Sequence, residues 1–412
     1  MKAIIMAGGK GTRVASVNRD LPKPMLPING KPVLEYQIEC LRRQGIADII
    51  LSIGHLGEQI QAYFGDGSCL GVQITYIREE VPLGTAGALY YLKGRVREDF
   101  FLINGDLIFD VDFHRLMAFH KQHHAAATLL GHPNDHPYDS GIIVADANGR
   151  VTSWLTKEDE RGWYRNCVNA GIHVLSPGLL EKMDTPKKID LDREILRPML
   201  PSGQVYVYRT PEYVKDMGTP ERISQVENDL KTGLVERKNL GKKQKAVFLD
   251  RDGTINRYVG FLRRPEEFQL LDEAAEAIRR INQSGYLAIV VTNQPVIARG
   301  EVTWEGLEET HKKMETLLGR EGAYLDDIFV CPHHPDKGFP GEVPVYKMAC
   351  DCRKPKPGLL LQAAKKYNID LAESWMIGDQ PQDTQAGEAA GCRTIRLNEQ
   401  MNLLDAVKEI GL

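Results

Sequence analysis

VFLDRDGT, residues 247–254, joins a short apolar run to two aspartates, a glycine and a threonine. In a strand, residues two apart point to the same side, so Asp250 and Asp252 would leave the end of a strand over 246–249 together. One carboxylate can then attack phosphorus while the other protonates the leaving oxygen and later activates water. Gly253 permits the sharp turn that follows, and Thr254 can hydrogen-bond nearby. The stretch predicts a buried strand that carries a nucleophile and an acid/base at its end.

Three further patterns follow in order, each after a predicted strand or loop. VVTNQ (290–294) places Thr292 and Asn293 to donate hydrogen bonds to phosphoryl oxygens. Arg353 and Lys354 supply cations opposite developing negative charge. IGDQPQD (377–383) offers Asp379, which could hold Mg²⁺ together with the first carboxylate. Its second aspartate, at position 383, either assists that metal or only caps the following helix.

A loop rich in sulfur precedes the two cations. CPHHP (331–335) and CDC (350–352) supply three thiols and an imidazole in the set Cys331, His333, Cys350 and Cys352. This donor set suits tetrahedral Zn²⁺ and leaves no open coordination position, so we expect a structural zinc. The zinc would fix the loop whose next residues are the arginine and lysine at 353 and 354.

These motifs together resemble the haloacid dehalogenase (HAD) superfamily of phosphatases over about residues 245–412. The resemblance implies Asp250 as nucleophile, Asp252 as acid/base, and Mg²⁺ held by Asp250, the backbone carbonyl of Asp252 and Asp379. The zinc loop is similar to a branch that includes heptose bisphosphate and histidinol-phosphate phosphatases, and TNQPVIARG (292–300) favours the heptose type. The short interval between Thr254 and the next predicted helix leaves no room for a cap domain. Gln380 departs from the lysine that relatives often carry there.

The N-terminal half opens with a strand, then AGGKGTR (7–13) and LPKPM (21–25). The glycines let backbone amides approach a nucleotide closely, and the cations supply the charge that a triphosphate needs. The pattern is neither a Walker A loop nor G-x-G-x-x-G. The residues predicted to bind nucleotide and phosphate here are Gly8, Gly9, Gly11, Thr12, Arg13 and Lys23.

Over about residues 1–230 the sequence resembles the sugar-1-phosphate nucleotidyltransferases. LGTAGAL (83–89) matches the loop that contacts base and sugar through Gly84 and Thr85, and NAGIHVL (169–175) matches the sugar-binding segment with Asn169. The resemblance implies a second Mg²⁺ held by Asp106 and Asp216, around which the sugar phosphate oxygen attacks the α-phosphorus in line.

One further match in the same half is incomplete. Lys157 is expected to meet the sugar phosphate, but Thr156 stands where relatives often have glutamate. The missing carboxylate suggests a sugar whose hydroxyl groups differ from those of glucose.

Apolar runs alternate with amphipathic stretches over all 412 residues, which is typical of α/β proteins. In the first half, this periodicity predicts a strand over 48–53 and helices over 33–43 and 85–92. We predict a Rossmann-like nucleotidyltransferase domain over 1–230, a solvated basic linker over 231–245 and a Rossmannoid HAD domain without a cap over 246–412. A net charge of −4 gives no electrostatic reason for nucleic acid or membrane as a partner. No apolar run approaches a membrane span and no signal peptide is evident, so a cytoplasmic protein is expected. The oligomeric state stays open.

The two resemblances together suggest consecutive steps. A heptose 1,7-bisphosphate would lose its 7-phosphate, and a nucleotidyl group, from GTP by resemblance to the GDP-heptose route, would pass to the heptose 1-phosphate. Two alternatives stay open: the same chemistries on another pair, such as a hexose 1-phosphate or a histidinol-phosphate-like substrate, or an N-terminal half that only senses sugar nucleotides and regulates the phosphatase.

Overall fold

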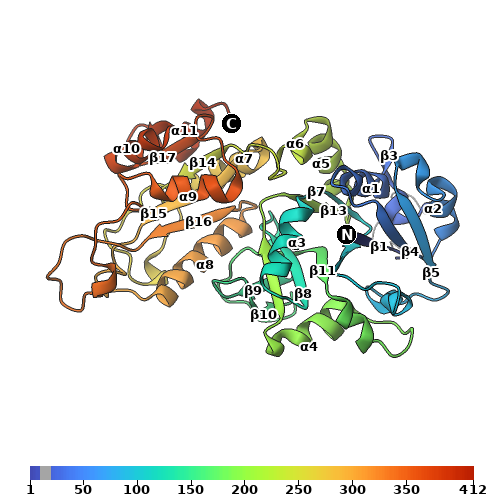
Figure 1. Ribbon diagram of the computed structural model, residues 1–412. Helices are drawn as coiled ribbons and strands as arrows, with labels where there is room; N and C mark the ends of the chain where they lie inside the picture. Colours follow the sequence, from blue (N-terminus) through green and yellow to red (C-terminus); the bar gives the residue numbers. More distant parts are fainter. Residues whose placement is uncertain (10–19) are drawn as a thin grey trace. The chain divides into compact units, whose positions relative to one another are not determined.

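The computed structural model describes residues 1–9 and 20–412. The chain divides into two compact units, which are described separately below (Figure 1). Unit 1 comprises Met1–His132, Ile143–Trp154 and Asn169–Asn239, and unit 2 comprises Pro133–Ile142, Leu155–Val168 and Leu240–Leu412.

Unit 1 is built on a mixed sheet with the order β10-β9-β11-β6-β1-β4-β5, to which β8 and β12 add beside β11. Parallel strands β6, β1, β4 and β5 form one half of this sheet, and their apolar runs are buried because helices cover the sheet. A short antiparallel pair, β7 with β13, and a hairpin of β2 and β3 complete the unit. The strands are β1 Lys2–Ala7, β2 Pro27–Ile28, β3 Lys31–Pro32, β4 Asp48–Ile53, β5 Gln73–Arg78, β6 Phe100–Asn104, β7 Leu107–Asp110, β8 Ala127–His132, β9 Ile142–Ala145, β10 Val151–Leu155, β11 Val168–Leu175, β12 Val205–Arg209 and β13 Tyr213–Asp216.

The helices of unit 1 follow the amphipathic pattern of the sequence. Two of them begin at residues whose side chains accept the first backbone N–H groups: Asp112 caps α3 and Thr219 caps α5. The helices are α1 Val33–Arg43, α2 Gly57–Phe64, α3 Phe113–Gln122, α4 Arg197–Met199, α5 Pro220–Lys231 and α6 Leu234–Arg237.

The helix predicted over Thr85–Leu92 is wrong in type, because η4, Gly87–Leu92, is a 3-10 helix. A Cβ on Gly87 would lie 2.1 Å from the Lys187 carbonyl oxygen, so the turn is shaped by close contact with another segment. Such a long-range contact is invisible to a local pattern.

Unit 2 contains a parallel sheet with the order β16-β15-β14-β17-β18, with β14 in the middle (Figure 1). This order brings the carboxyl ends of β14, β15 and β17 side by side, where ligand sites of open α/β sheets form. The strands are β14 Ala246–Leu249, β15 Leu287–Asn293, β16 Asp327–Cys331, β17 Trp375–Gly378 and β18 Arg393–Arg396. The helices are α7 Ala274–Ser284, α8 Trp304–Arg320, α9 Gly358–Tyr367, α10 Pro381–Ala390 and α11 Leu403–Glu409.

Unit 2 also includes two short segments from the first half of the sequence. The 155–168 segment packs on α8: the Tyr164 N–H donates to Thr316 Oγ1 at 2.9 Å, and the hydroxyl of Thr316 donates back to the Tyr164 carbonyl at 3.1 Å. The N–H of Asn166 donates to the buried carboxylate of Glu315 at 2.6 Å. Helix α8 is therefore covered in part by a segment that precedes it by more than a hundred residues.

The stretch 231–245 differs from the solvated linker that its charge suggests. It contains helix α6, and Leu234, Val235 and Leu240 are buried. Between β14 and α7, where every residue is described, only the 3-10 turn η9 (Pro265–Glu267) lies, so this interval holds no cap domain. Among the described residues, no helix combines the length and the apolar character needed to cross a membrane.

Candidate active sites and metal centre

Asp250 follows β14 directly and lies almost fully buried at the carboxyl end of the sheet. Lys354 Nζ lies 2.7 Å from Asp250 Oδ1 and 2.6 Å from Asp383 Oδ1, so one buried ammonium bridges two carboxylates. Burial raises the pKa of Asp250 to about 7, although the lysine acts against this rise. Burial also disfavours the charge on Lys354, but attraction to both aspartates outweighs it and raises the pKa of the lysine.

Asp252 is held by side chains that only donate to it. Its Oδ1 accepts from Arg251 Nη2 at 3.0 Å and from Asn256 Nδ2 at 3.0 Å. Its Oδ2 accepts from Arg251 Nη2 and from Gln294 Nε2, each at 2.8 Å. Burial opposes ionisation, but the Arg251 charge and these hydrogen bonds hold the pKa of Asp252 below its ordinary value.

A group of carboxylates at this edge has the chemistry of a divalent cation site. Ligand atoms of Asp250, Asp379 and Asp383 all lie within 4.8 Å of one another. Asp379 Oδ1 is buried and has no hydrogen-bond partner among the described residues. A Cβ on Gly253 would lie 2.4 Å from Asp379 Oδ2, so glycine is required where the turn after β14 passes this carboxylate. Three carboxylates against one lysine fit a Mg²⁺ ion, which prefers hard oxygen ligands.

Some of the predicted phosphate-binding residues lie near Asp250, and others hydrogen-bond to the loop that carries Arg353 and Lys354. The side chain of Asn293 donates to the Lys354 carbonyl and accepts from the Lys354 N–H, both at 3.0 Å, and so anchors the lysine's backbone. Arg353 Nη1 donates to the carbonyl of His333 at 3.1 Å. Thr292 Oγ1 accepts from Gln294 Nε2, and the hydroxyl of the fully buried Thr254 has no hydrogen-bond partner in the described part of the chain.

Of the two roles that the sequence left open for Asp383, the structure shows the helix cap. Its Oδ2 accepts from the Gln380 N–H at 2.9 Å at the start of α10, which caps the helix. Its Oδ1 faces the ammonium of Lys354. Gln380, the departure from the expected lysine, donates from Nε2 to Asp379 Oδ2 at 2.7 Å and so contacts the proposed metal ligand instead.

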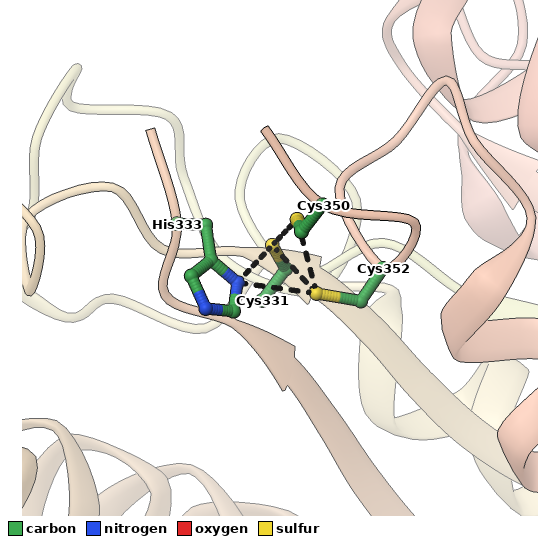
Figure 2. A group of neighbouring side chains, drawn as sticks. All are labelled: Cys331, His333, Cys350 and Cys352. Atoms are coloured by element: carbon green, nitrogen blue, oxygen red, sulfur yellow. Dashed lines mark hydrogen bonds between the residues drawn. The ribbon is translucent and has the colours of Figure 1, made fainter. Parts of the chain in front are cut away.

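The four predicted zinc ligands come together at the end of β16 (Figure 2). The Cys352 sulfur lies 3.2 Å from that of Cys331, 3.3 Å from that of Cys350 and 3.3 Å from His333 Nδ1. These separations are too long for a disulfide of about 2.05 Å. They approach the edge of about 3.8 Å of a tetrahedron whose Zn–S bonds are about 2.3 Å. The donor set and its spacing therefore fit a closed zinc site.

In unit 1, the antiparallel pair of β7 and β13 sets Asp106 and Asp216 near each other. Asp216 pairs with Leu107, and the Met217 N–H donates to the Asp106 carbonyl at 2.9 Å. Lys23 forms an ion pair with the carboxylate of Asp106, and Arg222 Nη1 contacts Asp216 Oδ2 at 2.7 Å. Both carboxylates thus stand beside cations at the position predicted for a metal.

The glycine-rich segments of unit 1 are held by close backbone contacts. A Cβ on Gly8 would lie 2.7 Å from Glu79 Oε1, and one on Gly84 would lie 2.4 Å from the Ile189 carbonyl. Gly84 also has a φ of +77°, which favours glycine. Glu79, which sequence reasoning missed, accepts from the Leu83 N–H at 2.9 Å and so fixes the start of the 83–89 loop.

Asn169 belongs to β11, and its Nδ2 lies 3.3 Å from Asp192 Oδ2. Burial raises the pKa of Asp192 to about 6, with Asp190 adding to the shift. Thr85 Oγ1 accepts from the Leu191 N–H at 2.7 Å, so the loop predicted to contact the sugar meets the same segment. Asp192 was also missed by sequence reasoning, because nothing in its local pattern distinguishes it from a surface residue.

The remaining predicted residues are placed as follows. Gly9 lies just beyond β1, and a Cβ there would meet nothing within 4 Å. Lys157 lies in the 155–168 segment that belongs to unit 2. Gly11, Thr12 and Arg13 lie outside the described residues.

Residues 2–233 match the nucleotidyl transferase family, and residues 351–399 match the HAD-hydrolase-like family. A D-glycero-beta-D-manno-heptose-1,7-bisphosphate 7-phosphatase from Yersinia pestis is 44% identical over 149 residues, which are 36% of this chain and 77% of the relative. The chain belongs to the nucleotidyl transferases and, through its C-terminal part, to the HAD phosphatases. The two predicted resemblances and the α/β fold class are therefore confirmed.

Relatives of the N-terminal part are more distant. A mannose-1-phosphate guanylyltransferase from Mycobacterium tuberculosis is 33% identical over 235 residues, which are 56% of this chain. The chain spans 65% of that relative, less than two thirds of its length. A crystal structure of HddC from Yersinia pseudotuberculosis has a TM-score of 0.49 and 28% identity, and covers 56% of this chain and 99% of the other.

Proposed function

We propose that unit 2 removes the 7-phosphate of a heptose 1,7-bisphosphate and that unit 1 then transfers GMP from GTP to the heptose 1-phosphate. The observation that carries this proposal is the buried Asp250–Lys354–Asp383 arrangement beside Asp252, in a chain whose C-terminal part is 44% identical to a heptose bisphosphatase. The products would be phosphate, pyrophosphate and a GDP-heptose.

In the phosphatase step, a carboxylate oxygen of Asp250 attacks phosphorus and forms an aspartyl-phosphate. The bond from phosphorus to the sugar oxygen breaks, and Asp252 gives that oxygen a proton. Water then attacks the aspartyl-phosphate while Asp252 takes a proton from it, and inorganic phosphate leaves. Lys354 holds Asp250 in place and offsets the charge of the phosphoryl group throughout.

The metals would assist both units without acting as nucleophiles. In unit 2, Mg²⁺ on Asp250, Asp379 and the Asp252 carbonyl would neutralise phosphoryl charge. Zinc on the Cys331, His333, Cys350 and Cys352 set would hold the loop that leads into Arg353 and Lys354. In unit 1, Mg²⁺ on Asp106 and Asp216 would draw the α-phosphate and the sugar phosphate together.

In the transferase step, the substrate's own phosphate oxygen attacks the α-phosphorus of the nucleotide, and pyrophosphate leaves. Lys23 and Arg13 would bind the triphosphate through their charge. The Gly84–Thr85 loop and Asn169 would contact base and sugar. We propose that Lys157 meets the sugar phosphate.

The order of the two steps follows from the chemistry of the substrates. The transferase needs a sugar that keeps its 1-phosphate, and dephosphorylation at C7 leaves that group in place. Guanine is supported by the name of the mycobacterial relative, which acts on mannose 1-phosphate, and heptose by the name of the Yersinia relative.

The test is an assay of the purified chain with both anomers of D-glycero-D-manno-heptose 1,7-bisphosphate, with and without GTP. We expect phosphate without GTP, and phosphate, pyrophosphate and GDP-heptose with it. A parallel panel of mannose 1-phosphate and histidinol phosphate with the four nucleotides separates the alternatives. If no phosphate is released from either heptose anomer, the proposed phosphatase substrate is wrong.

A further inference from the structure

Arg251 is a fully buried cation that lies between the two catalytic aspartates in the sequence. Its Nε and Nη2 donate to the Asp252 carboxylate, with distances from 2.8 to 3.2 Å. A guanidinium removed from water is strongly destabilising unless its donors find acceptors. The guanidinium group of Arg251 therefore neutralises Asp252, and it needs a further acceptor for its remaining amino group, Nη1.

That acceptor is His311, on the buried face of α8. Its Nε2 lies 3.3 Å from Arg251 Nη1, and the imidazole is itself almost fully buried. Arginine has donors only, so Nε2 must accept, which places the proton of the neutral ring on Nδ1. This hydrogen bond restrains the rotation of the guanidinium plane about the long axis of the Arg251 side chain.

We propose that His311 is a positioning residue for the acid/base Asp252. By accepting from Nη1 it sets the plane of Arg251, and this plane sets the orientation of the Asp252 carboxylate relative to Asp250. His311 does not touch substrate. The inference rests on the proposed phosphatase function, and it adds a residue from α8 to a site formed by strand ends, by the loop before α9 and by the start of α10.

The effect of a misplaced Asp252 on the reaction rate depends on the leaving group of the substrate. A sugar alkoxide is a poor leaving group and needs the proton from Asp252, whereas 4-nitrophenolate leaves without one. A misplaced acid should therefore slow the first step, in which the aspartyl-phosphate forms, much more for a sugar phosphate than for an aryl phosphate. The second step uses Asp252 in the same way with either substrate, so the two are compared through kcat/KM, which reports the first step. A general loss of stability would slow both equally.

The experiment compares His311→Leu, His311→Gln and Met314→Ala in the full chain with Mg²⁺. Leucine removes the acceptor at similar volume, and glutamine supplies a replacement oxygen. Met314, buried on the same helix, is the matched control that loosens α8 while leaving the hydrogen bond between Arg251 and His311 in place. Each protein is assayed with heptose 1,7-bisphosphate and with 4-nitrophenyl phosphate, and its thermal unfolding is recorded.

For His311→Leu we expect kcat/KM on the bisphosphate to fall about tenfold, a fraction of the ~10²–10⁴-fold that acid–base catalysis contributes. His311→Gln should recover most of this loss, and kcat/KM on the aryl phosphate should change less than about twofold. Equal losses on both substrates, a Met314→Ala loss of the same pattern, or no rescue by glutamine would overturn the inference. If the unchanged chain hydrolyses neither substrate, the proposed function itself fails.

Discussion

At the scale of single residues, the phosphatase site is an arrangement of buried charges. As the proposed nucleophile, Asp250 must be ionised, yet its burial raises its pKa to about 7. Lys354 favours the charged form and is itself charged because two aspartates face it. Each of these groups is tolerable in the interior only because the others are present.

Replacing Asp250 with asparagine should abolish phosphate release while leaving nucleotidyl transfer from heptose 1-phosphate intact. The amide keeps the shape of the side chain but cannot attack phosphorus, so we expect a loss of roughly 10³-fold or more. Phosphate and pyrophosphate are measured separately. The exposed Glu399→Gln variant in the same unit is the control and should retain both activities.

The raised pKa of Asp192 predicts how the stability of unit 1 depends on pH. Its folded-state pKa of about 6 lies above the ordinary value of about 3.9, so the folded protein binds the proton more tightly. The stability of unit 1 should fall as pH rises from about 4 to about 6, because the unfolded chain ionises first.

Asp192→Asn should remove this dependence and raise the free energy of unfolding of unit 1 at pH 8 by at most about 3 kcal/mol. At pH 4 the variant and the unchanged protein should be alike. The measurement is pulse proteolysis in urea at each pH, with fragments of unit 1 identified by mass. An equal difference in unfolding free energy between the two proteins at both pH values would contradict the raised pKa of Asp192.

At the scale of elements, the strands and helices follow local patterns closely. The predicted strands at 48–53 and 246–249 and the helix at 33–43 have the same bounds in the structure. Their apolar periodicity is strong and local. The turn at Gly87 and the helix in the supposed linker were missed because contacts with distant segments shape them.

The role of the zinc loop can be tested by replacing one of its predicted ligands. Cys352→Ser should release bound zinc, lower the melting temperature of unit 2 and reduce phosphate release, because the loop leads directly into Arg353 and Lys354. Metal content per chain, calorimetry and the phosphatase assay measure these effects. The exposed Cys69→Ser is the matched control. Full zinc content in Cys352→Ser would contradict the assignment of this ligand.

At the scale of the whole molecule, the proposed phosphatase groups lie in unit 2, and the proposed transferase carboxylates Asp106 and Asp216 lie in unit 1. Asp250→Asn and Asp106→Asn proteins, each inactive for the overall conversion, should together make GDP-heptose from heptose 1,7-bisphosphate and GTP. The heptose 1-phosphate released by one protein is a diffusible substrate for the other. Product formation in the mixture is compared with each variant alone and with the unchanged chain. No product in the mixture would mean that the intermediate passes only within one chain.

The sequence by itself determined the two families, the parallel sheet around VFLDRDGT and the four predicted zinc ligands, which the structure brings together. These follow from short motifs in a fixed order and from local periodicity. Only the tertiary structure decided that Lys354 bridges Asp250 and Asp383, that His311 accepts from Arg251, and that the 155–168 segment packs on α8. These contacts join residues dozens to more than a hundred positions apart. Their partners are fixed by packing and by the need to pair buried charges, and no local pattern encodes either.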